Sequence, residues 1–174
     1  MGCASTQLRT TIDEAREAVW NLRQKPAAVT SLGPLLQSMA EQVGHEFGVP
    51  VEFVISGKSF EFQRDTIHEL LMVAREAIYN AVRHGRPRTV QIRIHFEKHE
   101  CELTIADDGE GFDPKVMFAV PAGHYGLVGT QERIQRIGGR LAVNSQLGVG
   151  TEVVMHIRKG ASPSPEKSEV QAGL

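Results

Sequence analysis

The chain contains 174 residues, of which 41% are hydrophobic and 23% are charged, and its formal net charge is −2. This length fits one globular domain with short flanking segments. The near-neutral charge argues against a nucleic-acid-binding surface. No apolar run approaches the roughly 18 residues of a membrane span, so we expect this segment to make no direct membrane contact. Its two cysteines, Cys3 and Cys101, are too few and too far apart for a disulfide framework or a metal site.

Apolar residues recur at helical spacing in three stretches of the first half of the chain. Helices are predicted over 8–22, 32–47 and 63–84, with a strand over 51–55 and a turn over 56–59. Glycine and proline follow the second and third helices, as is typical of helix ends. The third helix has the broadest apolar stripe, formed by Ile67, Leu70, Leu71, Ala74, Ala77, Ile78, Ala81 and Val82.

Apolar and polar residues alternate in the second half, which is typical of strands with one buried face. Two strands are predicted from Val90 to Phe96 and from Cys101 to about Asp107, followed by a long Gly- and Pro-rich loop over 108–125. A helix is then expected over 127–137, and two final strands over 141–145 and 151–157. These elements predict a two-layer α/β sandwich, with a mixed, largely antiparallel sheet covered by helices on one face.

The long third helix carries polar residues opposite its apolar stripe. Glu76 and Asn80 are four residues apart and therefore share a face, and α-helical spacing places Arg83 and His84 on the same side. Carboxylate and amide oxygens are ligands that Mg²⁺ accepts, directly or through water, and Arg83 could contact phosphate oxygens. A solvated polar face is an equally good interpretation of this helix alone, and His84 could simply be a cation at a helix C-terminus.

Asp107 continues the inward-facing phase of Leu103 and Ile105, so an acid stands where the pattern requires an apolar side chain. A buried carboxylate needs a hydrogen-bond donor, and the exocyclic amine of adenine is a suitable one. The glycines at 109 and 111 would let the backbone approach a ligand closely. An ordinary Asp-Gly turn remains the simpler alternative for this segment alone.

Two further glycine-rich segments lie at 123–130, running into a helix, and at 148–151, entering the last strand. Backbone N–H groups at a loop–helix junction can form an anion site. Each segment is weak as a signal, because glycine-rich turns are common. The residues 57–59 imitate the end of a P-loop, but Glu52 occupies the position of the required first glycine.

In this order the four segments resemble the N, G1, G2 and G3 boxes of the histidine-kinase-like ATPase superfamily, also called the GHKL or Bergerat superfamily. Residues 75–84 resemble the N box, 107–112 the G1 box, 123–130 the G2 box and 148–151 the G3 box. The motifs are most similar to those of sensor kinases that work with the nitrate-response type of regulator. The resemblance spans roughly residues 9–158 and implies the Bergerat ATP-binding fold.

The resemblance also implies a role for each motif. Asn80 would bind Mg²⁺, Glu76 would position a metal-bound water or act as a base, and Asp107 would bind adenine with help from the Gly111 backbone. Thr151 would support Asp107 from the neighbouring strand. The remaining residues implied to contact ATP are Arg83 (lysine in many relatives), His84, Gly109, Phe112, His124, Tyr125, Gly126, Leu127, Gly129 and Thr130, with 126–129 cradling the phosphates and 113–125 forming a lid.

The acceptor histidine of these kinases lies on the first helix of a dimeric hairpin, in a box such as ELHD that this chain lacks. We expect residues 1–24 to be the end of that hairpin's second helix, residues 25–158 to be the ATP-binding domain and residues 159–174 to be a disordered tail. None of the seven histidines is expected to be the acceptor, so the chain alone should not phosphorylate itself.

The implied function is therefore that of the ATP- and Mg²⁺-binding catalytic domain of a two-component sensor histidine kinase. Its partners would be the phosphoacceptor domain of its own parent chain, in a homodimer, and a response regulator. It would lie in the cytoplasmic part of a membrane-anchored bacterial sensor. Alternatives that stay open are a gyrase-like or mismatch-repair-like ATPase, an anti-sigma serine kinase, and a nucleotide-sensing module without catalysis.

Overall fold

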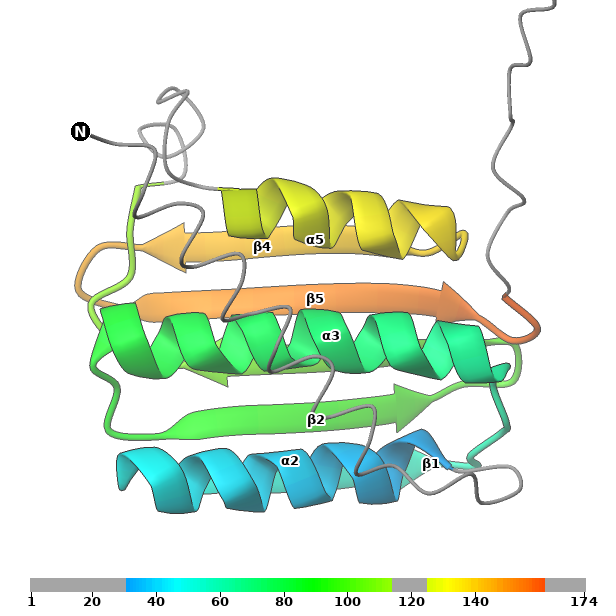
Figure 1. Cartoon of the computed structure of the whole chain (residues 1–174), viewed down its shortest axis with the longest axis horizontal. Coiled ribbons are helices and arrows are strands. Elements are labelled where there is room, and N and C mark those ends of the chain that lie inside the picture. Colours follow the sequence, from blue (N-terminus) through cyan, green and yellow to red (C-terminus); the bar gives the residue numbers. More distant parts are fainter. Residues whose placement is uncertain (1–30, 114–124, 162–174) are drawn as a thin grey trace, which may run out of the picture. The chain divides into compact units, whose positions relative to one another are not determined.

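The computed structural model describes residues 31–113 and 125–161, with only the backbone of residues 125–128. The described residues form a five-stranded sheet with the order β1-β2-β3-β5-β4 and three α-helices on one of its faces (Figure 1). The predicted two-layer sandwich is therefore confirmed. The predicted helix over 8–22 and nearly all of the predicted tail over 159–174 lie outside the described residues.

The sheet is mixed and largely antiparallel, as predicted. Its strands are β1 (Val51–Gly57), β2 (Val90–Phe96), β3 (Glu100–Asp107), β4 (Arg140–Gln146) and β5 (Gly150–Arg158). Among these strands only β1 and β2 pair in parallel. The helix between them carries the chain back to the end of the sheet at which β1 begins, so both strands run in the same direction. The predicted turn at 56–59 was wrong in its first half, since residues 56 and 57 continue β1 and pair with β2.

The helices are α2 (Leu32–Phe47), α3 (Arg64–Asn80) and α5 (Tyr125–Arg136). The bounds of α2 match the prediction, and the helix ends at Gly48, which adopts a left-handed conformation with φ of 67°. Beyond Asn80 the predicted third helix continues as a π-helical turn, η1 (Ala81–Gly85). Wider π-helical winding changes the direction of the side chains that follow, so α-helical spacing fails for the last predicted turn.

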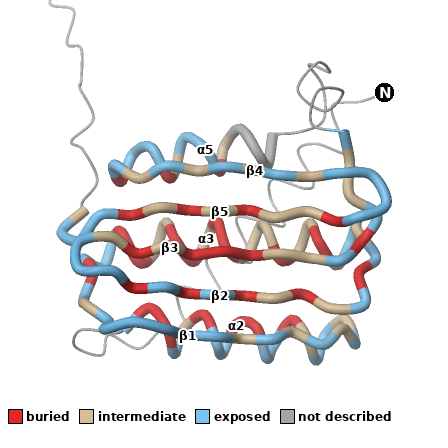
Figure 2. The backbone as a smooth tube through the Cα atoms, turned by 180° about the vertical axis from the view of Figure 1, so that it is seen from behind, coloured by how far each residue is buried: buried red, intermediate tan, exposed pale blue. Residues whose placement is uncertain are grey.

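The core lies between the helices and the inner face of the sheet. Along β2 the burial alternates, with the predicted apolar residues 90, 92, 94 and 96 buried. The helices contribute fully buried side chains to the same core, including Leu36, Leu70, Ile78 and Ile134. Each such side chain contributes about 1.5–3 kcal/mol of stability. Figure 2 views the sheet from behind, where no described helix covers it.

The four motif segments meet at one end of the sheet. Figure 1 shows the end of α3, the segment after β3, the start of α5 and the β4–β5 turn at this same end. They meet there because β3 and β4 run toward this end, β5 leaves it, and α3 finishes over it. No helix among the described residues has the length and apolar character needed to cross a membrane.

Candidate nucleotide-binding site

Glu76 and Asn80 contact each other on the last turn of α3, as their spacing predicts. The amide Nδ2 of Asn80 donates a hydrogen bond of 3.1 Å to Oε1 of Glu76, and both side chains are partly exposed. This contact assigns the nitrogen of the amide to Glu76, so the amide oxygen is the end that a cation would use. The hydrogen-bonded pair therefore presents oxygen ligands at the end of α3.

Arg83 and His84 follow on η1, and both are exposed. The guanidinium carbon of Arg83 lies 4.7 Å from the centre of the Tyr79 ring. Arg83 thus stacks on the residue that precedes Asn80. The prediction that Arg83 and His84 share the face of Glu76 assumed α-helical spacing, which the π-helical turn does not keep.

Asp107 closes β3 on the inner face, in phase with the buried Leu103 and Ile105. Its Oδ1 accepts a hydrogen bond of 2.9 Å from the backbone N–H of Gly109, and it pairs in register with Thr151 on β5. Burial raises the pKa of the Asp107 carboxyl above its ordinary value, and the backbone N–H groups of Gly109 and Thr151 offset only part of this rise. The carboxylate is held in place while it retains capacity to accept further hydrogen bonds.

Asp108, the second acid of the same motif, has a structural role instead. It is exposed, and its Oδ1 accepts backbone hydrogen bonds of 2.7 Å from Arg88 and 2.9 Å from Thr89. The Thr89 and Arg88 amides hold the pKa of Asp108 below its ordinary value. Asp108 therefore ties the segment after β3 to the start of β2.

Gly85 and Gly109 bring the end of η1 against the segment after β3. A Cβ atom on Gly109 would collide with the carbonyl oxygen of Gly85, so only glycine allows this approach. The N–H of Glu110 then donates a hydrogen bond of 2.7 Å to that carbonyl. From the sequence, Gly85 was predicted only to end the helix. In the structure it also connects the helix that carries Asn80 to the segment that follows the strand of Asp107.

Ser145 joins the β4–β5 turn to this segment, and sequence reasoning missed it. Its Oγ accepts a hydrogen bond of 2.8 Å from the N–H of Phe112, donates one of 3.1 Å to the carbonyl of Gly150, and lies 2.9 Å from Thr151 Oγ1. Gly111 has a φ of 59°, and a Cβ there would collide with the carbonyl oxygen of Gln146. A hydroxyl residue opposite Thr151 in the predicted strand pair was the only signal that could have found Ser145.

The helix α5 is held on α3 by an ion-paired clamp. Glu69, whose side chain is 12% exposed, lies 3.1 Å from Arg133 and 3.4 Å from Arg136. Near the start of α5, Gly129 is partly exposed and Thr130 is buried. His124 and the side chains of the predicted residues 125–127 lie outside what the structure describes.

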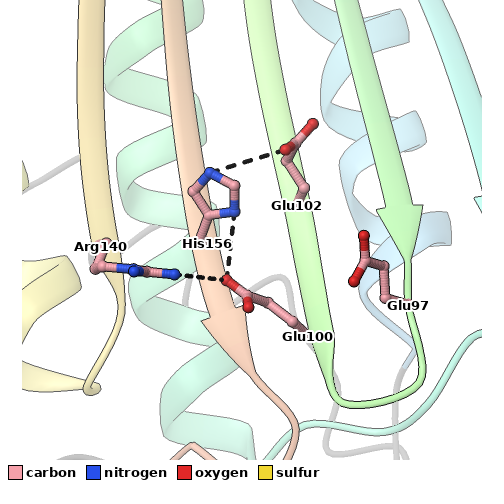
Figure 3. A pocket seen from close by; sticks show the side chains of 5 residues that line it. All are labelled: Glu97, Glu100, Glu102, Arg140 and His156. Carbon is pink, nitrogen blue, oxygen red and sulfur yellow. Dashed lines mark hydrogen bonds and ion pairs between the residues drawn. The ribbon is translucent and has the colours of Figure 1, made fainter.

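A second cluster lies at the opposite end of the sheet, on the face that no described helix covers. Glu97, Glu100, Glu102, Arg140 and His156 line a cavity of about 200 Å³ (Figure 3). Oε1 of Glu100 lies 3.2 Å from Arg140 and 3.3 Å from Nδ1 of His156. Arg140 and His156 pair with glutamates of the cluster, and the cluster contains none of the predicted site residues. In the part of the chain that the structure describes, no group of three or more His, Cys, Asp or Glu residues could hold a metal ion.

Residues 65–161 match the family described as "Histidine kinase-, DNA gyrase B-, and HSP90-like ATPase". The chain belongs to this ATPase family. The matched range includes nearly all of α3, η1, the four strands after them and α5, and it contains every described residue of the site. The predicted family is confirmed.

Two curated relatives of this ATPase-family chain carry names from signalling: one is a histidine-protein kinase/phosphatase and the other a sensor protein. The chain is 26% identical over 150 residues to the signal transduction histidine-protein kinase/phosphatase DegS of Brevibacillus brevis, covering 86% of this chain and 38% of that protein. It is 29% identical over 124 residues to the nitrate/nitrite sensor protein NarX of Escherichia coli K12, covering 71% of this chain and 20% of that protein. The chain thus spans well under half of the length of either relative.

Solved structures support the fold. The histidine kinase domain of the Erythrobacter litoralis EL346 blue-light activated histidine kinase matches with a TM-score of 0.61 and 21% identity, covering 79% of this chain and 66% of that one. The mycobacterial sensor histidine kinase MprB matches with a TM-score of 0.61 and 17% identity, covering 78% and 99%. At this identity the likeness establishes the shared architecture.

Proposed function

We propose that this chain is the ATP- and Mg²⁺-binding catalytic domain of a sensor histidine kinase. It would transfer the γ-phosphoryl group of ATP to a histidine on a dimerisation domain, for relay to a response regulator. The observation that carries the proposal is the position of Asp107, a half-buried carboxylate whose strand is joined through Gly109 and Gly85 to the helix of Asn80. The names of the sequence relatives DegS and NarX support the same reading.

Adenine would bind at Asp107. The carboxylate is fixed by backbone N–H groups and can still accept the exocyclic amine, which distinguishes adenine from a base with a carbonyl at that position. Gly111 would let the backbone approach the ring, and the Ser145 contact to Phe112 would hold that backbone in place. Thr151 would support the carboxylate from β5.

The phosphates would extend from Asp107 toward the end of α3 and the start of α5. Asn80 and Glu76 fit Mg²⁺, because this ion commonly takes one or two protein oxygen ligands and completes its shell with water and substrate phosphates. When bound, the ion would neutralise charge on the phosphate oxygens. Arg83 and the backbone N–H groups of residues 126–129 would neutralise the rest.

Catalysis would rest on positioning and charge neutralisation. An imidazole nitrogen would form a bond to the γ-phosphorus while the bond from that phosphorus to the bridging oxygen breaks, and ADP would leave with the electron pair. Glu76 would accept the proton displaced from the imidazole. The acceptor would lie on the phosphoacceptor domain of the parent chain, within a homodimer.

The remaining assignments follow from this proposal. Residues 1–24 would be the end of the phosphoacceptor hairpin, residues 25–158 the catalytic domain and residues 159–174 a tail. His84, His124 and the backbone of residues 125–130 would line the phosphate side of the site, and residues 113–125 would cover it. The domain would work on the cytoplasmic side of a membrane-anchored sensor.

Titration calorimetry with Mg-ATP tests the binding site. Asn80→Ala and Asp107→Ala should each weaken binding at least tenfold, since each removes a contact to a different part of the nucleotide. Arg93→Ala, an exposed change on the open face of the sheet, serves as the matched control. Undiminished binding in both site variants would contradict the proposed site.

A transfer assay tests the catalytic role. The chain alone should not label itself with γ-³²P-ATP, and adding a helical hairpin that carries the acceptor histidine should restore labelling. Robust hydrolysis by the chain alone would instead favour a gyrase-like ATPase, and transfer to a serine would favour an anti-sigma kinase. Binding without any transfer in the full dimer would favour a nucleotide sensor.

A further inference from the structure

Tyr79, immediately before Asn80, contacts arginines one turn before and one turn after it. The guanidinium carbon of Arg75 lies 5.3 Å from the centre of its ring, and that of Arg83 lies 4.7 Å away. Both distances fall within the range of a cation–π interaction. The closer contact is made by Arg83, the cation that follows Asn80 on η1.

The ring of Tyr79 is itself fixed by α2. Its hydroxyl donates a hydrogen bond of 3.0 Å to Oε2 of Glu46, and its ring packs edge-on against Phe47 at 5.4 Å between centroids. Burial raises the pKa of the Tyr79 hydroxyl, so the group stays protonated and remains a donor at neutral pH. Two helices therefore hold the surface on which Arg83 rests.

An exposed arginine on a π-helical turn has many accessible side-chain conformations. Stacking on a fixed ring restricts them and keeps the guanidinium group beside Tyr79, the residue that precedes Asn80, so less conformational freedom is lost when a phosphate binds. Arg75 stacks on the same ring from one turn earlier in α3, whereas Arg83 belongs to η1, after Asn80. The contact to Arg83 is thus the one that can act on the site.

We propose that Tyr79 is a positioning residue, which holds the guanidinium group of Arg83 in place for the phosphates of the nucleotide. This inference rests on the proposed function, because it requires phosphates to lie at the end of α3. Tyr79 and Glu46, which meet at the contact between α2 and α3, would thus affect the binding of the phosphates and not that of adenine.

A double-mutant cycle in the 174-residue chain tests this role, with affinities for Mg-ATP and for adenosine as the readout. Tyr79→Leu should weaken Mg-ATP binding about threefold, the size expected from one exposed cation–π contact, and leave adenosine binding unchanged. In an Arg83→Ala background the same change should have no further effect. Tyr79→Phe keeps the ring and should retain most of the affinity.

Arg75→Ala is the matched control, since it removes the other cation from the same ring and should leave both affinities unchanged. Equal losses for Mg-ATP and adenosine in Tyr79→Leu would mean a general structural effect and would overturn the inference. So would additive effects of Tyr79→Leu and Arg83→Ala. If Asn80→Ala and Asp107→Ala weaken Mg-ATP binding while Tyr79→Leu does not, only the role of Tyr79 fails.

Discussion

Replacing Ser145 with alanine removes the hydroxyl group that holds the segment after β3 against the β4–β5 turn. That group accepts a hydrogen bond from the Phe112 N–H, donates one to the Gly150 carbonyl and contacts Thr151 Oγ1. The change leaves the strands and their register intact. It therefore isolates the link between the two motif segments.

The expected loss of stability is about 1–3 kcal/mol. A typical hydrogen bond contributes about 1 kcal/mol, and a partly buried N–H group left without its partner costs about 1–3 kcal/mol. Water can reach this partly buried site and replace some of the lost contacts, which places the expectation toward the lower end of that range. For a domain of this size the melting temperature should fall by roughly 3–10 °C.

Guanidinium chloride unfolding of Ser145→Ala, compared with Ser59→Ala, measures this effect. Ser59 is exposed, so its replacement should change stability by less than about 0.5 kcal/mol. Under the proposed function, Ser145→Ala should also weaken adenosine binding, because the backbone beside the ring is no longer tethered. Equal unfolding midpoints for the two variants would refute the reasoning about Ser145.

Two further variants test the electrostatics. The raised pKa of Asp107 means that the folded state favours the neutral acid, so this residue's contribution to stability is present below its unfolded pKa and is lost as pH rises through its folded pKa. The melting temperature of Asp107→Asn should therefore rise relative to that of the wild type as the pH increases above about 4, the ordinary pKa of an aspartate. A difference that does not change with pH would contradict this. Glu69→Gln removes the charge that Arg133 and Arg136 share and should lower stability by about 1 kcal/mol in a denaturant titration. The exposed Glu132→Gln is its control, and equal midpoints would show that the clamp contributes nothing.

Local features of the fold could be predicted because they depend on neighbours along the chain. Helical spacing and the Gly48-Val49-Pro50 stop placed α2 at the observed bounds, and alternation placed the buried face of β2 correctly. The same alternation put Asp107 on the inner face, in phase with Leu103 and Ile105. Each of these signals is a period or a terminating residue within about twenty positions.

The nucleotide-binding motifs could also be named from the sequence, although their connections could not. Gly85 was only a helix stop until the structure placed its carbonyl against Gly109 and Glu110. Ser145 was only a hydroxyl residue in a predicted strand until β4 paired with β5 and set it beside Thr151. These five residues belong to segments that meet only in the folded chain.

The sequence by itself determined the family, the largely antiparallel sandwich and the inward position of the acid at 107, because these follow from local periodicity and from motif order. Only the tertiary structure decided the strand order, the π-helical turn after Asn80, the clamp on α5 and the contact of Tyr79 with Glu46. The clamp and the Tyr79–Glu46 contact join residues that are far apart in the chain, and the local turn after Asn80 forms where the chain packs against the segment after β3. Their geometry depends on how the layers pack, which no local pattern encodes.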